Sequence, residues 1–325
     1  MTDTHDPKLE QLVRKAGRRT PMPDDVRSRL ESSFRAELHQ VRRTRMTTRL
    51  TVGIGLAACL VLSVFMVNVN QPVPIQEVAT VTRLQGEALW HTGDFHGPMH
   101  AGAKLRSGDK ISTVEGGVAF QPLTNGLDVR LSAHTEVIVV DAQTLRLITG
   151  AVYVDATPGA SQTPYSIQAN EARIDHIGTQ YLVSVSGNNI EVAVREGEVQ
   201  IVQRNKEPIV SRADHSMGET VTIDGSGIKR QPISSHDERW LWTHELTPAL
   251  QTHDMYLRDF LDWYARQTGI EISYASADIE HAIVNTETHR IKGNLDTDIV
   301  VALDEAMLVD GFTATPQDGR VVISR

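Results

Sequence analysis

The sequence predicts a membrane-anchored, mainly β protein with a helical cytoplasmic tail, one transmembrane helix, an all-β domain and a small α+β C-terminal domain. Three observations predict this fold class. Residues 50–76 carry no charge, the hydrophobic period is two from about residue 78 to 223, and helical periods appear after residue 244. The predicted boundaries are 1–49 for the tail, 50–69 for the span, 77–203 for the β-domain, 204–243 for a linker with strands and 244–325 for the last domain.

The predicted span is an apolar run of 20 residues from Leu50 to Val69. A helix of that length measures about 30 Å, which matches the hydrocarbon thickness of a bilayer. A basic cluster precedes the run and none follows it; the cluster consists of Arg42, Arg43, Arg45 and Arg49. The positive-inside bias therefore places the first 49 residues in the cytoplasm and the rest across the membrane. No small-x-small site follows the run, so we expect the anchor to stay in the mature protein.

The charge distribution supports the same division. Residues 1–49 contain 12 Lys+Arg and 7 Asp+Glu, whereas the whole chain has a net charge of −9. Anionic lipid accounts for a basic excess beside a membrane, so a nucleic-acid partner is not expected. The single cysteine, Cys59, lies inside the predicted span, so the outer part has no disulfide and no cysteine-based metal site.

The tail carries an amphipathic segment that opens at Asp24 and Asp25 and places Leu30, Phe34 and Leu38 on one stripe. This stripe favours either a helix that docks into a groove of a cytoplasmic protein or a helix that lies on the inner leaflet. Within the span, small residues recur every four positions, at Thr51, Gly55, Cys59 and Ser63. That spacing permits a homodimer through the transmembrane helix, and it is also common in helices that do not associate.

The β-domain contains one unit three times, at residues 84–90, 148–154 and 195–201. Each unit has a glycine, Gly86, Gly150 or Gly197, followed by an alternating strand. A glycine inside a strand is typical of a bend or of a close approach to a neighbouring strand. The recurrence indicates stacked β layers, although the intervals are too unequal for a regular solenoid.

These units, with landmarks at 105–109, 111–113 and 178–183, resemble the FecR domain over roughly residues 80–203. The most specific marks of that family are a Gly-Thr-x-aromatic-x-Val step, here at 178–183, and the Val-x-x-Gly-x-Val strand at 194–199. The resemblance assigns a structural motif role to four residues, which are Gly150, Gly178, Thr179 and Gly197.

The C-terminal domain is predicted to follow the order helix, strand, helix, hairpin. Leu257, Phe260, Leu261 and Tyr264 mark one face of the first helix, and Gly269 ends it. A strand follows at 270–274, a helix at 296–308, and a hairpin around Asp318-Gly319. Residues 257–269, 291–295 and 301–303 resemble the short domain at the N-terminus of secretins and of signal-transducing TonB-dependent receptors.

The two resemblances together imply a function. FecR-type proteins sit in the inner membrane with a cytoplasmic N-terminus and a periplasmic C-terminal region, and they regulate an extracytoplasmic-function sigma factor, often in the control of iron transport. Their periplasmic half receives a signal from an outer-membrane TonB-dependent receptor. Typical members have a longer tail with a Trp-containing motif, and residues 1–49 contain no Trp. The second hypothesis is an envelope scaffold that binds a secretin, a polysaccharide or peptidoglycan. The third hypothesis is a periplasmic hydrolase.

No motif in the sequence indicates a catalytic site, a metal site or a cofactor site. Three histidines have a ligand-like spacing but lie in a segment that reads as a loop, namely His91, His96 and His100. Asp175 and His176 lie near Ser166 in the sequence, which suggests a catalytic triad, yet no elbow motif accompanies them. Glu196 and Glu198 flank Gly197 and are expected on a solvated strand edge, and no glycine-rich loop with Lys exists to bind a phosphate.

Overall fold

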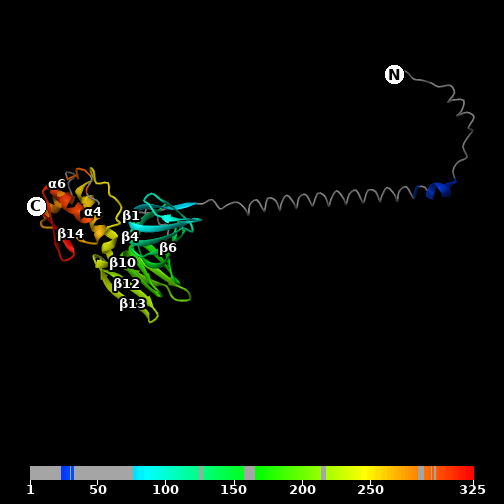
Figure 1. The fold of residues 1–325 in the computed structure, drawn as a ribbon, viewed down its shortest axis with the longest axis horizontal. Coiled ribbons are helices and arrows are strands. Elements are labelled where there is room, and N and C mark those ends of the chain that lie inside the picture. The colour runs from blue at the N-terminus through cyan, green and yellow to red at the C-terminus, as the bar shows by residue number, and fades with distance from the viewer. Residues whose placement is uncertain are drawn as a thin grey trace, which may run out of the picture. The chain divides into compact units, whose positions relative to one another are not determined.

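The computed structural model describes residues 23–29, 31–32, 76–123, 127–156, 165–213, 217–284, 289–293, 295 and 298–325 (Figure 1). The side chains of residues 177, 179, 300, 309 and 310 are not among those described. The chain divides into two units, Met1–Val73 and Pro74–Arg325. In the first unit, residues 24–29 are helical, and Val26 N–H donates to the Pro23 carbonyl.

Several sequence predictions fall on residues outside the described ranges. They are the tail stripe of Leu30, Phe34 and Leu38, the span from Leu50 to Val69, and its small residues, Thr51, Gly55, Cys59 and Ser63. Among the residues that the structure does describe, none belongs to a helix with the length and apolarity that a membrane crossing requires.

The second unit contains a sheet of 13 strands, in which β13-β12-β10-β9-β8-β7-β5-β4-β1-β2 lie side by side and β3, β6 and β11 pair off this path. The strands are β1 Glu77–Thr92, β2 Phe95–Pro98, β3 Lys104–Arg106, β4 Lys110–Pro122, β5 Leu127–Leu131, β6 Glu136–Asp141, β7 Thr144–Ala156, β8 Ser166–Ala169, β9 Ala172–Ser186, β10 Asn189–Gln203, β11 Ile209–Arg212, β12 Met217–Asp224 and β13 Gly227–Ser234. One apolar core, mostly Val, Ile and Leu, takes residues from strands between β1 and β12. The alternation of apolar residues in the sequence is the origin of this core.

The repeated glycines lie where long strands bend. Gly86, Gly150 and Gly197 have φ of 70°, 90° and 78°, which side chains with a Cβ rarely adopt. Before Gly150, β7 pairs with β6 and β8, and from Gly150 onward it pairs with β9 and then β5. A Cβ at Gly150 would lie 2.5 Å from the Thr135 Cα. Glycine thus permits both the bend and the close approach of the neighbouring chain.

The segment 204–243, predicted as a linker with strands, contains strands that belong to the sheet of the β-domain. Strands β11, β12 and β13 lie within it, and β10 pairs with both β11 and β12, so residues up to Ser234 extend the sheet. The β-domain therefore continues past residue 203. The physical reason is that β10 is long enough to offer one edge to two successive strands, on either side of the bend at Gly197. A 3-10 turn, η1 (Glu238–Trp240), and a short helix, α3 (Leu241–His244), follow.

The C-terminal domain has a three-stranded sheet in the order β14-β16-β15, with β14 parallel and β15 antiparallel to β16. Its elements are α4 Leu257–Thr268, β14 Glu271–Tyr274, α5 Ala277–Val284, α6 Ile299–Asp310, β15 Thr313–Gln317 and β16 Arg320–Ser324. Gly269 ends α4 with φ 68°, and Asp318 and Gly319 form the hairpin turn with φ of 35° and 80°. The helix α5 was not predicted, because eight residues are too short for a clear period.

Candidate functional site

A set of buried polar side chains joins the β-domain to helix α4. We call it the polar junction, and it consists of Asp128, Arg130, Asp155, Gln180, Arg195, Arg266 and Gln267. All except Arg266 are buried. Buried charged groups are rare unless they are paired, so the members of this cluster are expected to pair with one another.

Asp155, at the end of β7, is the centre of the polar junction and is 4 % exposed. Its Oδ1 accepts from Arg266 Nη2 at 2.5 Å. Its Oδ2 accepts from Gln180 Nε2 at 3.0 Å and from Gln267 Nε2 at 3.2 Å. Arg266 also donates to the Ala156 carbonyl and to the carboxylate of Glu196. One carboxylate therefore accepts from two residues of α4 and from a neighbouring strand.

Arg130, on β5, is fully buried and connects three segments of the chain. Its Nε donates to Asp128 Oδ2 at 2.5 Å, its Nη1 to the Thr243 carbonyl at 2.8 Å, and its Nη2 to Gln267 Oε1 at 2.7 Å. A planar guanidinium offers donors in several fixed directions, which suits this role better than the single ammonium of lysine.

Arg195, on β10, holds the end of α4 from the other side. Its Nε donates to the Ser235 carbonyl at 2.6 Å and its Nη1 to the Gln267 carbonyl at 3.0 Å. Its guanidinium lies 5.4 Å from the ring centre of Trp240, which is fully buried. Ser235 Oγ in turn donates to the Gly269 carbonyl at 2.7 Å. The carbonyls that end α4 are thus satisfied by the β-domain.

The protonation of the junction follows from its burial. Burial raises the pKa of Asp128, although Arg130 opposes the shift. Burial lowers the pKa of Arg266, but Asp155 and Glu196 outweigh it, so the net shift is upward. Burial, Arg195 and Arg130 together lower the pKa of His244 to about 4, so this ring is neutral at physiological pH. Arg130 pairs with Asp128, and Arg266 pairs with both Asp155 and Glu196, so each of these carboxylates has a guanidinium partner. Arg195 donates to backbone carbonyls instead.

A groove of about 390 Å³ runs along the polar junction and is lined by Gln180, Arg195, Glu196, Ser235, Ala265, Arg266, Gly269, Ile270 and Glu271. Arg195 Nη2 has no hydrogen-bond partner among the described residues. Four other polar side chains that line the groove have hydrogen-bond partners within the protein, namely Gln180, Glu196, Ser235 and Arg266. The groove therefore marks the seam between the two domains and presents little free chemistry to a ligand.

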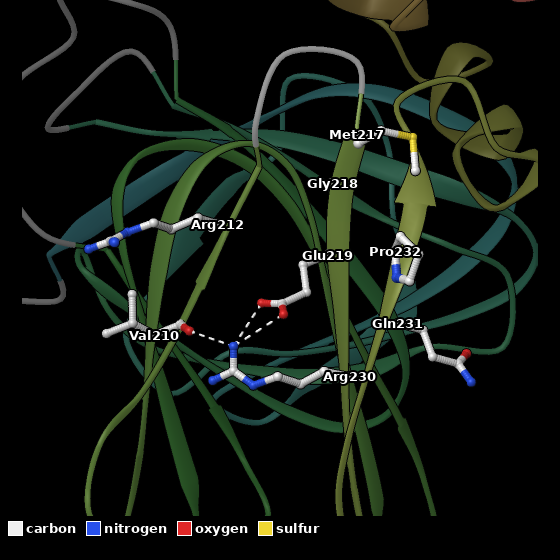
Figure 2. A pocket seen from close by; sticks show the side chains of 8 residues that line it. All are labelled: Val210, Arg212, Met217, Gly218, Glu219, Arg230, Gln231 and Pro232. Atoms are coloured by element: carbon white, nitrogen blue, oxygen red, sulfur yellow. Dashed lines mark hydrogen bonds and ion pairs between the residues drawn. The ribbon is translucent and has the colours of Figure 1, made fainter.

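A second groove, of about 550 Å³, lies between β11, β12 and β13 (Figure 2). Arg230 reaches across it from β13, and its Nη1 donates to the Val210 carbonyl at 3.1 Å and to both carboxylate oxygens of Glu219. Arg212 points to the rim, where it pairs with Glu198. The charged groups inside are paired with each other, which fixes β11 against β12 and β13 and leaves no catalytic constellation there.

The three glycines of the family motif have positive φ, so their role is conformational and they do not form a ligand site. Gly150 and Gly197 lie at strand bends, and Gly178 lies in β9 with φ 63° and no atom near a hypothetical Cβ. The side chain of Thr179 is not described. Glu196 is exposed, as expected for a solvated strand edge, and its carboxylate also pairs with Arg266 of α4.

The serine, histidine and aspartate considered in the sequence do not form a relay. Ser166 Oγ donates to Asp175 Oδ1 at 2.5 Å, but neither ring nitrogen of His176 has a partner among the described residues. His176 instead stacks on Tyr181 with ring centres 6.2 Å apart. Burial lowers the pKa of His176. The described residues contain no group of three or more His, Cys, Asp or Glu side chains arranged to hold a metal ion.

Sequence reasoning did not predict the polar junction. Arg130 lies in a strand where all five residues are buried, and Asp155 ends a similar apolar run. A charged residue at an inward position of an apolar strand was the available signal, because it needs a buried partner. The partners could not be identified, since Arg130 and Gln267 are far apart in the sequence.

The comparisons with known proteins concern the β-domain. The FecR protein family matches residues 109–200, from just before β4 into β10. No curated protein matches the sequence. Two crystal structures, at 2.50 and 1.65 Å, of a candidate anti-sigma factor from Parabacteroides distasonis ATCC 8503 show 15% identity and a TM-score of 0.33, covering 66% of this chain and 98% of that chain. A likeness this weak supports no functional argument. The family match includes Gly150, Gly178, Thr179 and Gly197, and the chain therefore contains a FecR-family domain.

Proposed function

We propose that this protein is a FecR-type regulator that spans the inner membrane once and relays a periplasmic signal to a cytoplasmic transcription regulator. The observation that carries the proposal is the FecR-family domain at residues 109–200. The partner class follows from the family resemblance: an extracytoplasmic-function sigma factor on the cytoplasmic side. An outer-membrane TonB-dependent receptor, or a secretin-like protein, is the proposed periplasmic partner. No step of this function requires the protein to be an enzyme.

The proposed topology is supported by the sequence around the apolar run. The run from Leu50 to Val69 has the length of a membrane helix, and basic residues cluster only on its N-terminal side. In this arrangement residues 1–49 contact the cytoplasmic partner, with Leu30, Phe34 and Leu38 as the proposed contact stripe. The FecR domain and the α+β domain lie in the periplasm.

The polar junction supports a role in relaying a signal. A partner that binds the α+β domain can act on the FecR domain only if the two domains are mechanically coupled. Arg266 and Gln267 of α4 bond to Asp155 at the end of β7, and Arg130 and Arg195 hold the same helix end from two strands. A buried ionic contact of this kind forms only in a defined geometry. Removing one of its partners destabilises the protein strongly, because the other charge then stays buried without a counter-charge.

The partner side of the proposal is tested by capture with the full chain. Membranes that contain the tagged protein would be solubilised, and the captured proteins identified by mass spectrometry. A sigma factor should co-purify with the natural chain and be lost when Phe34 and Leu38 are replaced by Ala, while membrane localisation is retained. Leu12→Ala is the matched control, because Leu12 belongs to a separate apolar stripe nearer the N-terminus, formed by Leu9, Leu12, Val13 and Ala16. Capture of a secretin or of glycan without a sigma factor would favour the envelope scaffold instead.

The topology is tested with reporter fusions. An enzyme that is active only in the periplasm should be active when fused after Arg325 and inactive when fused before Leu50. Ala57→Lys should impair insertion, because a charge at the centre of a membrane helix costs about 2.5–3.5 kcal/mol on insertion scales. The reverse reporter pattern would remove the basis of the proposed relay.

A further inference from the structure

The hairpin formed by β1 and β2 brings two histidines together on its surface. His91 and His96 are directly opposite each other in the register of the two strands. Gly93 and Asp94 make the turn between them, with φ 55° at the glycine. The segment is therefore a hairpin and not the loop that its glycines suggested. His91 is half-buried, and His96 is exposed.

The two rings have the spacing of a chelating pair. Their Nδ1 atoms lie 3.0 Å apart, the ring centres are 3.9 Å apart, and the rings are tilted by 58°. An ion at about 2.0–2.1 Å from each nitrogen would subtend an N–ion–N angle of roughly 95° at this separation. That angle matches two adjacent positions of a square-planar or tetragonal site, which is the geometry that Cu²⁺ and Ni²⁺ adopt with nitrogen ligands. It is smaller than the tetrahedral angle of zinc sites.

From this geometry we propose that His91 and His96 form a two-histidine binding site for a divalent transition metal, with Cu²⁺ bound most tightly. The preference for Cu²⁺ follows from the affinity order of divalent metals at nitrogen sites. The β-strands hold both ligands in place before the ion arrives, so binding costs little conformational freedom. The remaining coordination positions face solvent, where water or a donor from another molecule completes the shell.

The neighbouring residues limit the site to two protein ligands. Lys110 is opposite His91 on β4, and its Nζ pairs with Glu136 at 2.7 Å, so that carboxylate is engaged. His100 Nδ1 lies 3.0 Å from the Ala101 carbonyl, and its ring packs edge-on against Trp90, so it does not join the pair. A site with two ligands and open positions binds reversibly, which distinguishes it from a structural metal centre.

The test is a Cu²⁺ titration of the purified full chain, followed by calorimetry and by electron paramagnetic resonance. The natural protein should bind one more Cu²⁺ than either His91→Gln or His96→Gln, with nitrogen hyperfine structure from two imidazoles, and each variant should lose at least tenfold in affinity at this site. His100→Gln should behave as the natural protein. Comparison between variants removes the contribution of the other histidines and of the N-terminal amine.

A second readout separates binding from misfolding. Cu²⁺ should raise the melting temperature of the natural protein and of His100→Gln, but not of the two variants. Without metal, the melting temperatures of the two variants should stay close to that of the natural protein, because His96 is exposed and His91 is only half-buried. Equal Cu²⁺ binding by His96→Gln and the natural chain would overturn the proposal. So would a spectrum with a single imidazole, in which case the two rings are only hydrogen-bonded.

Discussion

Arg266 Nη2 donates to Asp155 Oδ1 at 2.5 Å, and this contact joins helix α4 of the C-terminal domain to the end of strand β7 in the FecR-family domain. Asp155 is buried, and the Arg266 side chain is 18% exposed. Two glutamines and two further arginines surround the pair, and all four are buried, namely Gln180, Gln267, Arg130 and Arg195. The geometry ties the conformation of the β-domain to the position of α4.

Removal of the central carboxylate should loosen this contact. We expect Asp155→Asn to lower the free energy of unfolding by about 3 kcal/mol, because it leaves the half-buried Arg266 with one fewer counter-charge. Arg173→Ala, which removes an exposed pair with Asp175, should cost less than about 1 kcal/mol. Urea unfolding followed by tryptophan fluorescence measures both. Equal effects of the two substitutions would show that the buried pair has no special role.

The two glutamates that flank Gly197 should differ. Glu196→Lys places a positive charge beside Arg266 and should destabilise the contact with α4. Glu198→Lys disturbs only the surface pair with Arg212. Hydrogen exchange of the amides in α4 reports on the difference. We expect faster exchange in the first variant alone, and similar exchange in both would contradict the assignment of Glu196 to the domain contact.

The glycine positions should respond according to the space around them. Gly150→Ala should cost about 3 kcal/mol or more, because φ is 90° and the new Cβ meets Thr135. Gly178→Val has an open surrounding and should cost about 1–2 kcal/mol from backbone strain. Gly187→Ala, with φ 58° and no neighbour, is the control. Melting temperatures rank the three, and a Gly178 variant less stable than the Gly150 variant would contradict this ranking.

Acidification should lower the free energy of unfolding, and His244 should be one source of this loss. Burial and the nearby Arg195 and Arg130 hold its pKa at about 4, whereas an unfolded histidine titrates near 6.5, and Asp298 opposes the shift. Between these two values the unfolded chain binds the extra proton, so stability falls as the pH falls from about 6.5 to 4, by at most about 3 kcal/mol. The change in unfolding free energy between pH 7 and pH 5 should be smaller in His244→Gln. An identical change would exclude His244 as its source.

Local patterns were sufficient to predict much of the described fold. Gly269 and the pair Asp318-Gly319 end a helix and make a hairpin for reasons that reside in their own backbone angles. The glycine in each repeated unit indicated a bend for the same reason. Strands were predicted past residue 203, but their place in the sheet was not, because pairing of β11 and β12 with β10 depends on how that strand bends in three dimensions.

The functional surfaces required contacts between distant segments. Arg130 and Gln267 meet only because α4 packs on the β-domain, and no local pattern specifies that meeting. His91 and His96 were assigned to a loop, because Gly93 and Gly97 suppressed the strand pattern of a short hairpin. A sequence pattern gives the least information about the spatial neighbours of side chains at strand ends and turns.

The central claim, that the chain relays a signal to a transcription regulator, is tested most directly by transcript levels. Cells that lack the protein would be complemented with the full chain, with a chain in which Phe34 and Leu38 are replaced by Ala, or with Asp155→Asn. The account predicts that one set of promoters changes on loss of the protein, that the full chain restores it, and that the Phe34/Leu38 variant does not although it reaches the membrane. Asp155→Asn should alter the response to the signal. Unchanged transcripts in cells without the protein would contradict the account.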